Sequence, residues 1–219
     1  MPHKTSKSGH DDGTINIDAL LAEAGFDTPA SRKRARAELE RAGLTNARKG
    51  AIAVYKRALA LKLLHERLAC VCGAECGALL ADAREPVVTA GHSCEVCLGS
   101  NNRRASLAAA RALERGGVKR VLVVGGTPTQ QQELARLLAP TLTLEFVDGT
   151  RSHSQRDALA NMKRVQMVVI WGATPLRHAV SDLYTSEPLP HLRVVAVSKR
   201  GIEALCREIE RNMTGGGRR

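Results

Sequence analysis

The stretch RVLVVGGTPTQQQELARLLA, residues 120–139, predicts a buried strand, a glycine turn and a helix in succession. Three more strand and helix pairs follow it: LTLEFVDG with SHSQRDALANM, VQMVVIWG with TPLRHAVSDLYT, and RVVAVS with KRGIEALCREIERN. Strands that alternate with helices form a parallel sheet through right-handed crossovers. We therefore expect an α/β domain over residues 118–211, with a four-stranded, doubly wound parallel sheet in the order 2-1-3-4 and helices on both faces.

A cysteine-rich segment precedes this sheet. Its two close pairs, Cys72-x3-Cys76 and Cys94-x2-Cys97, have the spacing of a tetrahedral Zn²⁺ site, for which Cys70 and His92 are alternative ligands. Four thiolates leave zinc no open position, so the expected site is structural rather than catalytic. We expect residues 70–117 to form a zinc-binding module and a connecting helix, NNRRASLAAARALER, that joins it to the following domain, and Cys206 to be a core residue.

Residues 15–69 predict a basic, α-helical N-terminal domain. Apolar spacing and glycine stops indicate helices over about 15–25, 28–43 and 51–69, the second with Thr28 as N-cap and Pro29 at its first position. Three helices with short turns are compatible with a helix-turn-helix arrangement and equally with any small bundle. Residues 1–14 and 212–219 are polar or glycine-rich and are expected to be disordered tails.

The formal net charge is +11, which favours nucleic acid over a membrane as the partner. Residues 32–57 hold nine basic against two acidic residues, and helical spacing places several of the cations on one face. The candidate nucleic-acid-binding residues are Arg32, Lys33, Arg34, Arg36, Arg41, Arg48 and Lys49. A solvated helix face is the alternative interpretation. Aromatic residues make up only 2%, which argues against single-strand binding by base stacking.

In a doubly wound sheet, a ligand lies beyond the carboxyl ends of the strands. The candidate residues at this rim are Gly125, Gly126, Thr127, Asp148, Thr150, Arg151, Gly172, Thr174, Lys199 and Arg200. The Gly125-Gly126 turn before a helix suggests a place for an anion such as a small nucleotide. Ordinary turn and cap chemistry explains the same residues, since neither the GxGxxG nor the GK[ST] motif is present. No catalytic residues are predicted, so enzyme activity is left open.

The runs CEVCLGSNNRRA, RVLVVGGTP, FVDGT, VVIWGATPLRHAVSDLYT and VVAVSKRGIEAL are similar to a family of bacterial Rossmann-like domains of unknown function, the 2325 family. The similarity covers roughly residues 94–206. It departs from the family pattern at Leu98, where glycine is expected in the cysteine turn, although Gly99 is present. The resemblance implies a Rossmann-like fold and no activity. A more distant similarity to nucleotide-sensing Rossmann-like domains favours a small nucleotide on the rim.

These features predict a nucleic-acid-binding protein, with DNA as the expected partner, in which the α/β domain mediates assembly or senses a ligand. A nucleotide sensor or nucleotide-processing enzyme acting at the rim is one alternative, and a pure protein-interaction module is another. The apolar runs are too short to span a bilayer, so no membrane is expected as a partner and the location is expected to be cytoplasmic. A homo-oligomer is compatible with the sequence.

Overall fold

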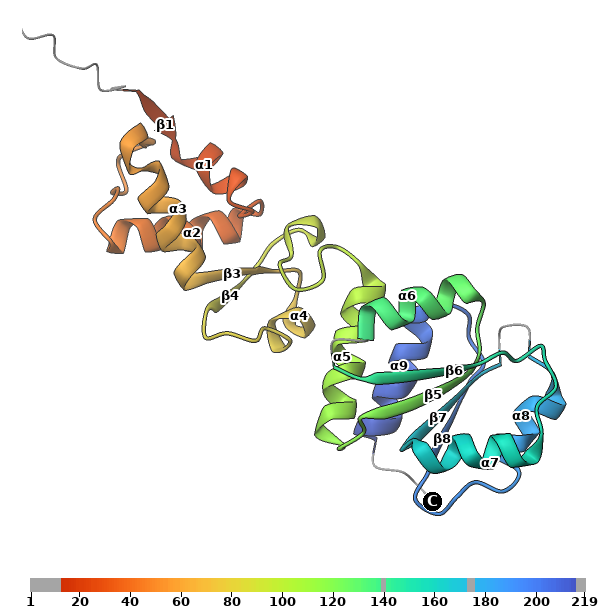
Figure 1. Cartoon of the computed structure of the whole chain (residues 1–219). Helices are drawn as coiled ribbons and strands as arrows, with labels where there is room; N and C mark the ends of the chain where they lie inside the picture. The colour runs from red at the N-terminus through yellow and green to blue at the C-terminus, as the bar shows by residue number, and fades with distance from the viewer. Residues whose placement is uncertain (1–12, 139–140, 173–175, 216–219) are drawn as a thin grey trace, which may run out of the picture. The chain divides into compact units, whose positions relative to one another are not determined.

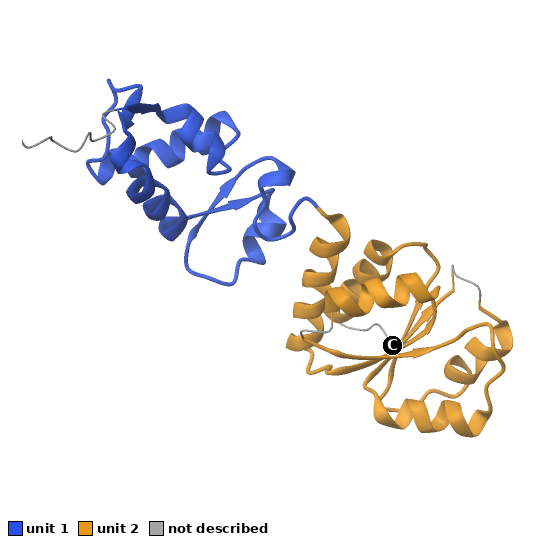
Figure 2. Cartoon of the chain, turned by 45° about the horizontal axis from the view of Figure 1, so that its top comes forward, with its two compact units in different colours: residues 1–99 blue, residues 100–219 orange. Residues whose placement is uncertain are grey.

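The computed structural model describes residues 13–138, 141–172 and 176–215. The chain divides into two compact units, unit 1 over residues 1–99 and unit 2 over residues 100–219 (Figure 2). Unit 1 contains both the helical N-terminal part and the cysteine segment. The connecting helix, expected within the same segment as the cysteines, belongs to unit 2, because Ala105, Ala109 and Leu113 pack into the core of the α/β unit. The expected boundary after residue 117 therefore lies near residue 99.

The N-terminal part of unit 1 is mainly helical (Figure 1). Its elements are β1 (Thr14–Asn16), α1 (Ile17–Glu23), α2 (Pro29–Arg41), β2 (Ala51–Ala53), the 3-10 helix η1 (Val54–Lys56) and α3 (Arg57–Arg67). Asn16 caps α1, and Thr28 and Ser31 form a reciprocal capping box at the start of α2. Ile17, Leu20, Leu21, Phe26, Leu39 and Leu64 form the buried centre of this part.

The third helix differs from the expectation. It begins at Arg57 rather than near residue 51, because Ala51–Ala53 pairs with β1 as a short antiparallel ladder in which Ile15 faces Ile52. The predicted tails fall mostly on residues 1–12 and 216–219, which lie outside the described residues. Thr14, by contrast, is part of β1, and the last helix continues to Thr214.

The cysteine segment forms the remainder of unit 1. It contains β3 (Leu68–Val71), α4 (Ala74–Ala78), β4 (Glu85–Val88) and η2 (Gly91–Ser93). Strands β3 and β4 pair in parallel, with Cys70 opposite Val87. Asp27, at the end of the α1–α2 loop, accepts hydrogen bonds from Ala90 N (2.8 Å) and Ser93 Oγ (2.6 Å). This carboxylate ties the cysteine segment to the helices.

Unit 2 is an α/β domain built on one parallel sheet. Its elements are α5 (Asn101–Arg115), β5 (Arg120–Gly125), α6 (Pro128–Leu138), β6 (Thr143–Val147), α7 (Gln155–Arg164), β7 (Met167–Trp171), α8 (His178–Thr185), β8 (Arg193–Val197) and α9 (Ile202–Thr214). The strand order is β6-β5-β7-β8, and all neighbours are parallel. The predicted strand order and the strand and helix alternation are confirmed.

Helices cover both faces of this sheet, as predicted (Figure 1). One buried cluster joins α5, α6 and α9 to alternate residues of the strands, including Val123 and Val169. A second cluster joins α7 and α8 to the intervening residues, including Leu122 and Val168. Cys206 on α9 is fully buried in the first cluster, which confirms its expected place in the core. No described helix is long and apolar enough to cross a membrane.

Candidate metal centre and charged surfaces

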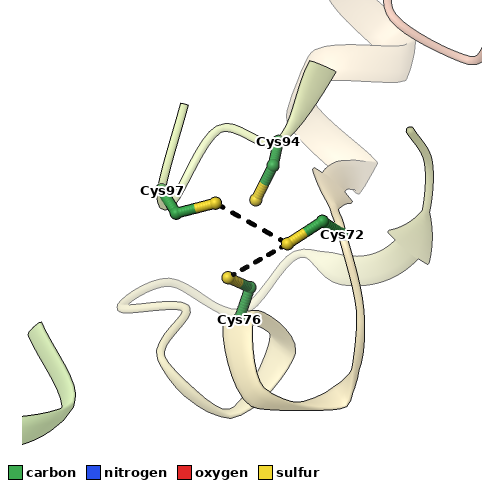
Figure 3. A group of neighbouring side chains, drawn as sticks. All are labelled: Cys72, Cys76, Cys94 and Cys97. Atoms are coloured by element: carbon green, nitrogen blue, oxygen red, sulfur yellow. Dashed lines mark hydrogen bonds between the residues drawn. The ribbon is translucent and has the colours of Figure 1, made fainter. Parts of the chain in front are cut away.

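Four cysteine sulfurs converge in unit 1 (Figure 3). The Sγ atoms of Cys72, Cys76, Cys94 and Cys97 all lie within 4.8 Å of one another. Cys72 Sγ is 3.5 Å from Cys76 Sγ and 3.6 Å from Cys97 Sγ. A tetrahedral zinc ion with Zn–S bonds of about 2.3 Å requires sulfurs about 3.8 Å apart. The cluster can therefore hold a metal ion, and all four predicted cysteines belong to it.

The local structure explains why these sulfurs meet. Cys72 directly follows β3, and Cys76 lies on α4. Two hydrogen bonds join the turn that carries the second pair to β3. Glu95 N donates to Cys70 O (2.9 Å), and Cys70 N donates to Glu95 Oε1 (2.8 Å). Arg84 Nη1 donates to Glu95 Oε2 at 2.8 Å and holds this carboxylate in place. The second cysteine pair is thus fixed beside the first.

The surroundings of the sulfurs act on individual thiols in opposite directions. Cys76, Cys94 and Cys97 are buried and Cys72 is half-buried. Burial alone would raise the pKa of the Cys94 thiol, but backbone N–H groups, those of Cys97 and Cys72 first, outweigh it and lower the pKa to about 7. Burial raises the pKa of Cys76. A bound cation would stabilise the buried thiolates.

Neither alternative ligand joins this group. Cys70 is buried with its sulfur 3.9 Å from Ala24 O, and burial raises its thiol pKa to about 12. The side chain of His92 is 81% exposed, and its Nε2 lies 3.3 Å from Asp27 Oδ2. The ligand set is therefore narrowed to the four cysteines.

The turn after the second cysteine pair has an unusual backbone. Leu98 has a φ of +51°, the one positive value at a non-glycine residue among those described, and Gly99 follows at +75°. The turn is closed by a hydrogen bond from Leu98 N to Cys94 O at 2.9 Å. A left-handed conformation favours glycine. The position where the family pattern expects glycine thus adopts the conformation that glycine would favour.

The cations predicted on α2 are largely engaged within unit 1. Glu38 is only 2% exposed and accepts from Arg34 (2.5 Å), Arg41 (2.5 Å) and Arg67 (3.1 Å). Arg34 also forms a two-pronged ion pair with Glu85 on β4. The carboxylate of Glu85 comes from outside residues 32–57, so folding offsets part of the local excess of positive charge. Arg34 and Arg41 are thus both paired with carboxylates inside unit 1.

Two other predicted cations stabilise the backbone. Arg32 Nε donates to Phe26 O at 3.2 Å. Arg36 pairs with Glu40 and donates from Nη2 to Asn46 O (3.2 Å) and Lys49 O (2.6 Å). Arg36 thereby fixes the turn after α2. The remaining predicted cations, Lys33, Arg48 and Lys49, are exposed.

Part of the predicted rim lines a pocket of about 280 Å³ in unit 2. Its lining residues are Gly126, Thr127, Pro128, Gln131, Asp148 and Thr150. Gly125 immediately precedes them, and Arg151 Nε lies 3.2 Å from Asp148 Oδ2. Lys199 and Arg200 line a different pocket. Gly172 N donates to Val197 O at 2.9 Å, and Thr174 lies outside the described residues. The ten rim residues therefore do not form one site.

At the start of α6, where an anion site was expected, backbone N–H groups already donate hydrogen bonds within the chain. Thr127 N donates to Gln130 Oε1 (3.0 Å), and Gln130 N donates to Thr127 Oγ1 (3.4 Å). Gln131 Nε2 donates to the carbonyls of Gly125 and Gly126. Asp148 adds a carboxylate to the same pocket. The pocket therefore suits a hydroxyl-rich or amine-bearing ligand better than a bare phosphate.

Comparison with known proteins gives no match to a family model, a curated protein or a solved structure.

Proposed function

We propose that the four-cysteine cluster holds one structural Zn²⁺ ion. Support comes from the convergence of the four sulfurs and from their burial. A set of four cysteine ligands closes a tetrahedral zinc site, so the ion stabilises the fold and does not bind substrate. The segment around the cluster has a small apolar core, in which Val71 and Val96 pack against the cysteines. A bound ion would therefore contribute much of the folding free energy of this segment.

For unit 2, the proposed class is a Rossmann-like domain of the bacterial family that the sequence resembles. The strand order and the helices on both faces support the class. The positive φ of Leu98, at the position of the family's glycine, is consistent with the resemblance.

The proposed activity is nucleic-acid binding by a cytoplasmic protein, with DNA as the preferred partner and a helix-turn-helix arrangement of α1, α2 and α3. The observation that carries this proposal is the turn after α2. Arg36 donates hydrogen bonds to Asn46 O and Lys49 O and so holds the backbone of this turn in place. The exposed cations Arg48 and Lys49 therefore lie on an ordered turn. Because the backbone of this turn is already ordered, a contact between these side chains and phosphates does not have to order it.

The test is fluorescence polarisation of a labelled random DNA duplex with the full chain, over a range of salt concentrations. Replacing Lys33, Arg48 and Lys49 with Gln should weaken binding at least about tenfold at low salt and flatten the salt dependence. A control variant replaces Lys62, Arg156 and Lys163, which removes the same charge elsewhere. Equal effects of the two variants would reject this turn as the contact, and absence of duplex and RNA binding at low salt would reject the function.

A second candidate function is nucleotide sensing or processing at the pocket beside Gly126, where Asp148 can accept hydrogen bonds from the hydroxyls of a nucleotide's sugar rather than contact its phosphates. Nucleotides should then raise the unfolding temperature of the chain, and Thr150→Phe, which fills the pocket, should abolish the shift. Thr129→Phe, on the same side of unit 2 but outside the lining, is the control. If the chain binds neither nucleic acid nor nucleotide, the protein-interaction module is the remaining interpretation.

A further inference from the structure

Most of the excess positive charge lies in unit 2. Unit 1 has 14 Lys and Arg residues against 12 Asp and Glu, whereas unit 2 has 19 against 10. The basic segment of residues 32–57 is thus balanced within its own unit. Affinity for a polyanion grows with the number of phosphates that cations neutralise. Unit 2 is therefore the better place for an extensive contact with a polyanion.

Eight of these 19 cations lie on α5, on α9 or in the loop before α9, at one face of the sheet. Helices α5 and α9 lie side by side there (Figure 1), and Asn102 Oδ1 accepts from Glu203 N at 3.1 Å between them. Their cations, with those of the loop before α9, are Arg103, Arg104, Arg111, Arg115, Lys199, Arg200, Arg207 and Arg211. The acidic residues of the same segments are Glu114, Glu203, Glu208 and Glu210. On the opposite face, α7 and α8 hold three cations against two carboxylates.

A pocket of about 480 Å³ lies between the start of α5, the loop before α9 and α9 itself. It is lined by Asn102, Lys199, Arg200, Gly201, Glu203, Ala204, Arg207 and Arg211. Arg207 and Arg211 are one helical turn apart, about 6 Å along the axis. Lys199 and Arg200 are exposed and have no ion pair within the described part of the chain. The pocket therefore presents a row of cations rather than a single charge.

The carboxylates near this row of cations do not prevent the cations from contacting a phosphate. Glu210 lies 3.3 Å from Arg207, and Glu208 lies 2.6 Å from Arg211, in pairs that are partly exposed to solvent. Such pairs contribute at most about 1 kcal/mol, so either arginine can reorient toward a phosphate at small cost. Glu203 is the single acidic residue of the lining against four cations.

We propose that this pocket and the surrounding α5–α9 face bind the phosphodiester backbone of nucleic acid. The proposal rests on the nucleic-acid binding proposed above and adds a second contact surface to it. Each strand of a duplex carries one phosphate about every 3.4 Å of axis. The row of cations extends over more than one turn of α9, so it can contact successive phosphates of one strand. A mononucleotide would contact the cations at only one end of the row.

The test compares two double variants of the full chain in the duplex-binding assay. Lys199→Gln with Arg200→Gln should lower affinity at least about fivefold at low salt and reduce the slope of log K against log salt by as much as about 2. The control, Arg156→Gln with Lys163→Gln, removes the same charge from α7 on the opposite face and should have little effect. Circular dichroism and the unfolding temperature check that both variants fold.

Three other outcomes would overturn the proposal. Equal losses in the two double variants would indicate that only net charge matters. If wild type binds duplex, and affinity is lost on changing Lys33, Arg48 and Lys49 but kept on changing Lys199 and Arg200, the proposed function stands and the second surface is wrong. If nucleoside triphosphates raise the unfolding temperature through Lys199 and Arg200 while duplex affinity is unchanged, the pocket serves a small phosphorylated ligand instead.

Discussion

Glu38 Oε1 lies 2.5 Å from Arg34 Nη2, and this carboxylate is only 2% exposed. Burial alone would raise the pKa of Glu38, but hydrogen bonds from Arg34, Arg67 and Arg41 outweigh it and lower the pKa to about 2. Because Arg67 is on α3 and Arg34 also reaches β4, the buried charge joins α2 to α3 and to the cysteine segment.

Acid should therefore destabilise unit 1 through Glu38. A carboxyl with a lowered folded-state pKa stabilises the fold above its unfolded pKa, near 4.5, and that stabilisation is lost as the pH falls toward 2. We expect a loss on the order of 3 kcal/mol in the free energy of unfolding across this window. Glu38→Gln should remove most of this pH dependence, whereas Glu66→Gln should leave it unchanged. An unaltered acid transition in Glu38→Gln would contradict the role given to this carboxylate.

Leu98→Gly should stabilise the cysteine turn, because a left-handed backbone costs a leucine about 1–2 kcal/mol and Leu98 is 62% exposed, so it loses little packing. A rise in unfolding free energy of about 1 kcal/mol is expected. Leu98→Ala keeps the strain and should bring no such gain. Urea unfolding of both variants measures the difference, and equal stabilities would show that the turn is not strained.

Gly126→Ala should be more damaging than Gly201→Ala. Both glycines have positive φ, +85° and +92°, but a Cβ at Gly126 would lie 2.9 Å from the Trp171 ring, whereas none of the described atoms lies within 4 Å at Gly201. We expect about 1 kcal/mol for the backbone term at Gly201 and about 1–3 kcal/mol more at Gly126. Thermal unfolding tests the comparison. A Gly126 substitution is for this reason unsuitable as a simple block of the neighbouring pocket.

Asp27→Asn should loosen the cysteine segment. The carboxylate accepts from Ala90 N and Ser93 Oγ and lies beside His92, contacts that an amide cannot all keep. A chelator should then remove the bound metal several times faster than from wild type, as followed by a colorimetric zinc indicator. Asp18→Asn, in the first turn of α1, is the control. Equal release rates for the two variants would mean that this tie does not protect the metal site.

The sequence was sufficient where local pattern decides the structure. Alternation of strands and helices predicts the α/β sheet and its order, and the spacing of Cys72, Cys76, Cys94 and Cys97 predicts the sulfur cluster. The pairing of Ala51–Ala53 with β1 was missed because both strands are three residues long and far apart in the chain. The ion pairs around Glu38 could be predicted only in part. The spacing of Arg34 and Glu38 suggests an ion pair, but Arg67 and Glu85 join the group only through folding.

The candidate surfaces show the same limit. A count of charges along the chain placed the cationic surface at residues 32–57, because it does not include carboxylates such as Glu85 that arrive through folding. The basic pocket of unit 2 combines the loop before α9, one face of α9 and Asn102 of α5. All of its lining residues except Asn102 fall within residues 199–211, and Lys199 and Arg200 were already rim candidates. What the sequence did not indicate is that Arg207, Arg211 and Asn102 line the same pocket as these two cations.

The most direct test of the metal centre is the mass of the full chain under non-denaturing conditions, compared with its mass after denaturation. We predict one zinc ion per chain, lost in Cys94→Ser and retained in Cys206→Ser, whose cysteine lies in the core of unit 2. A chelator should remove the ion and disorder the cysteine segment. A wild-type chain that is folded, free of metal and indifferent to chelator would contradict the account.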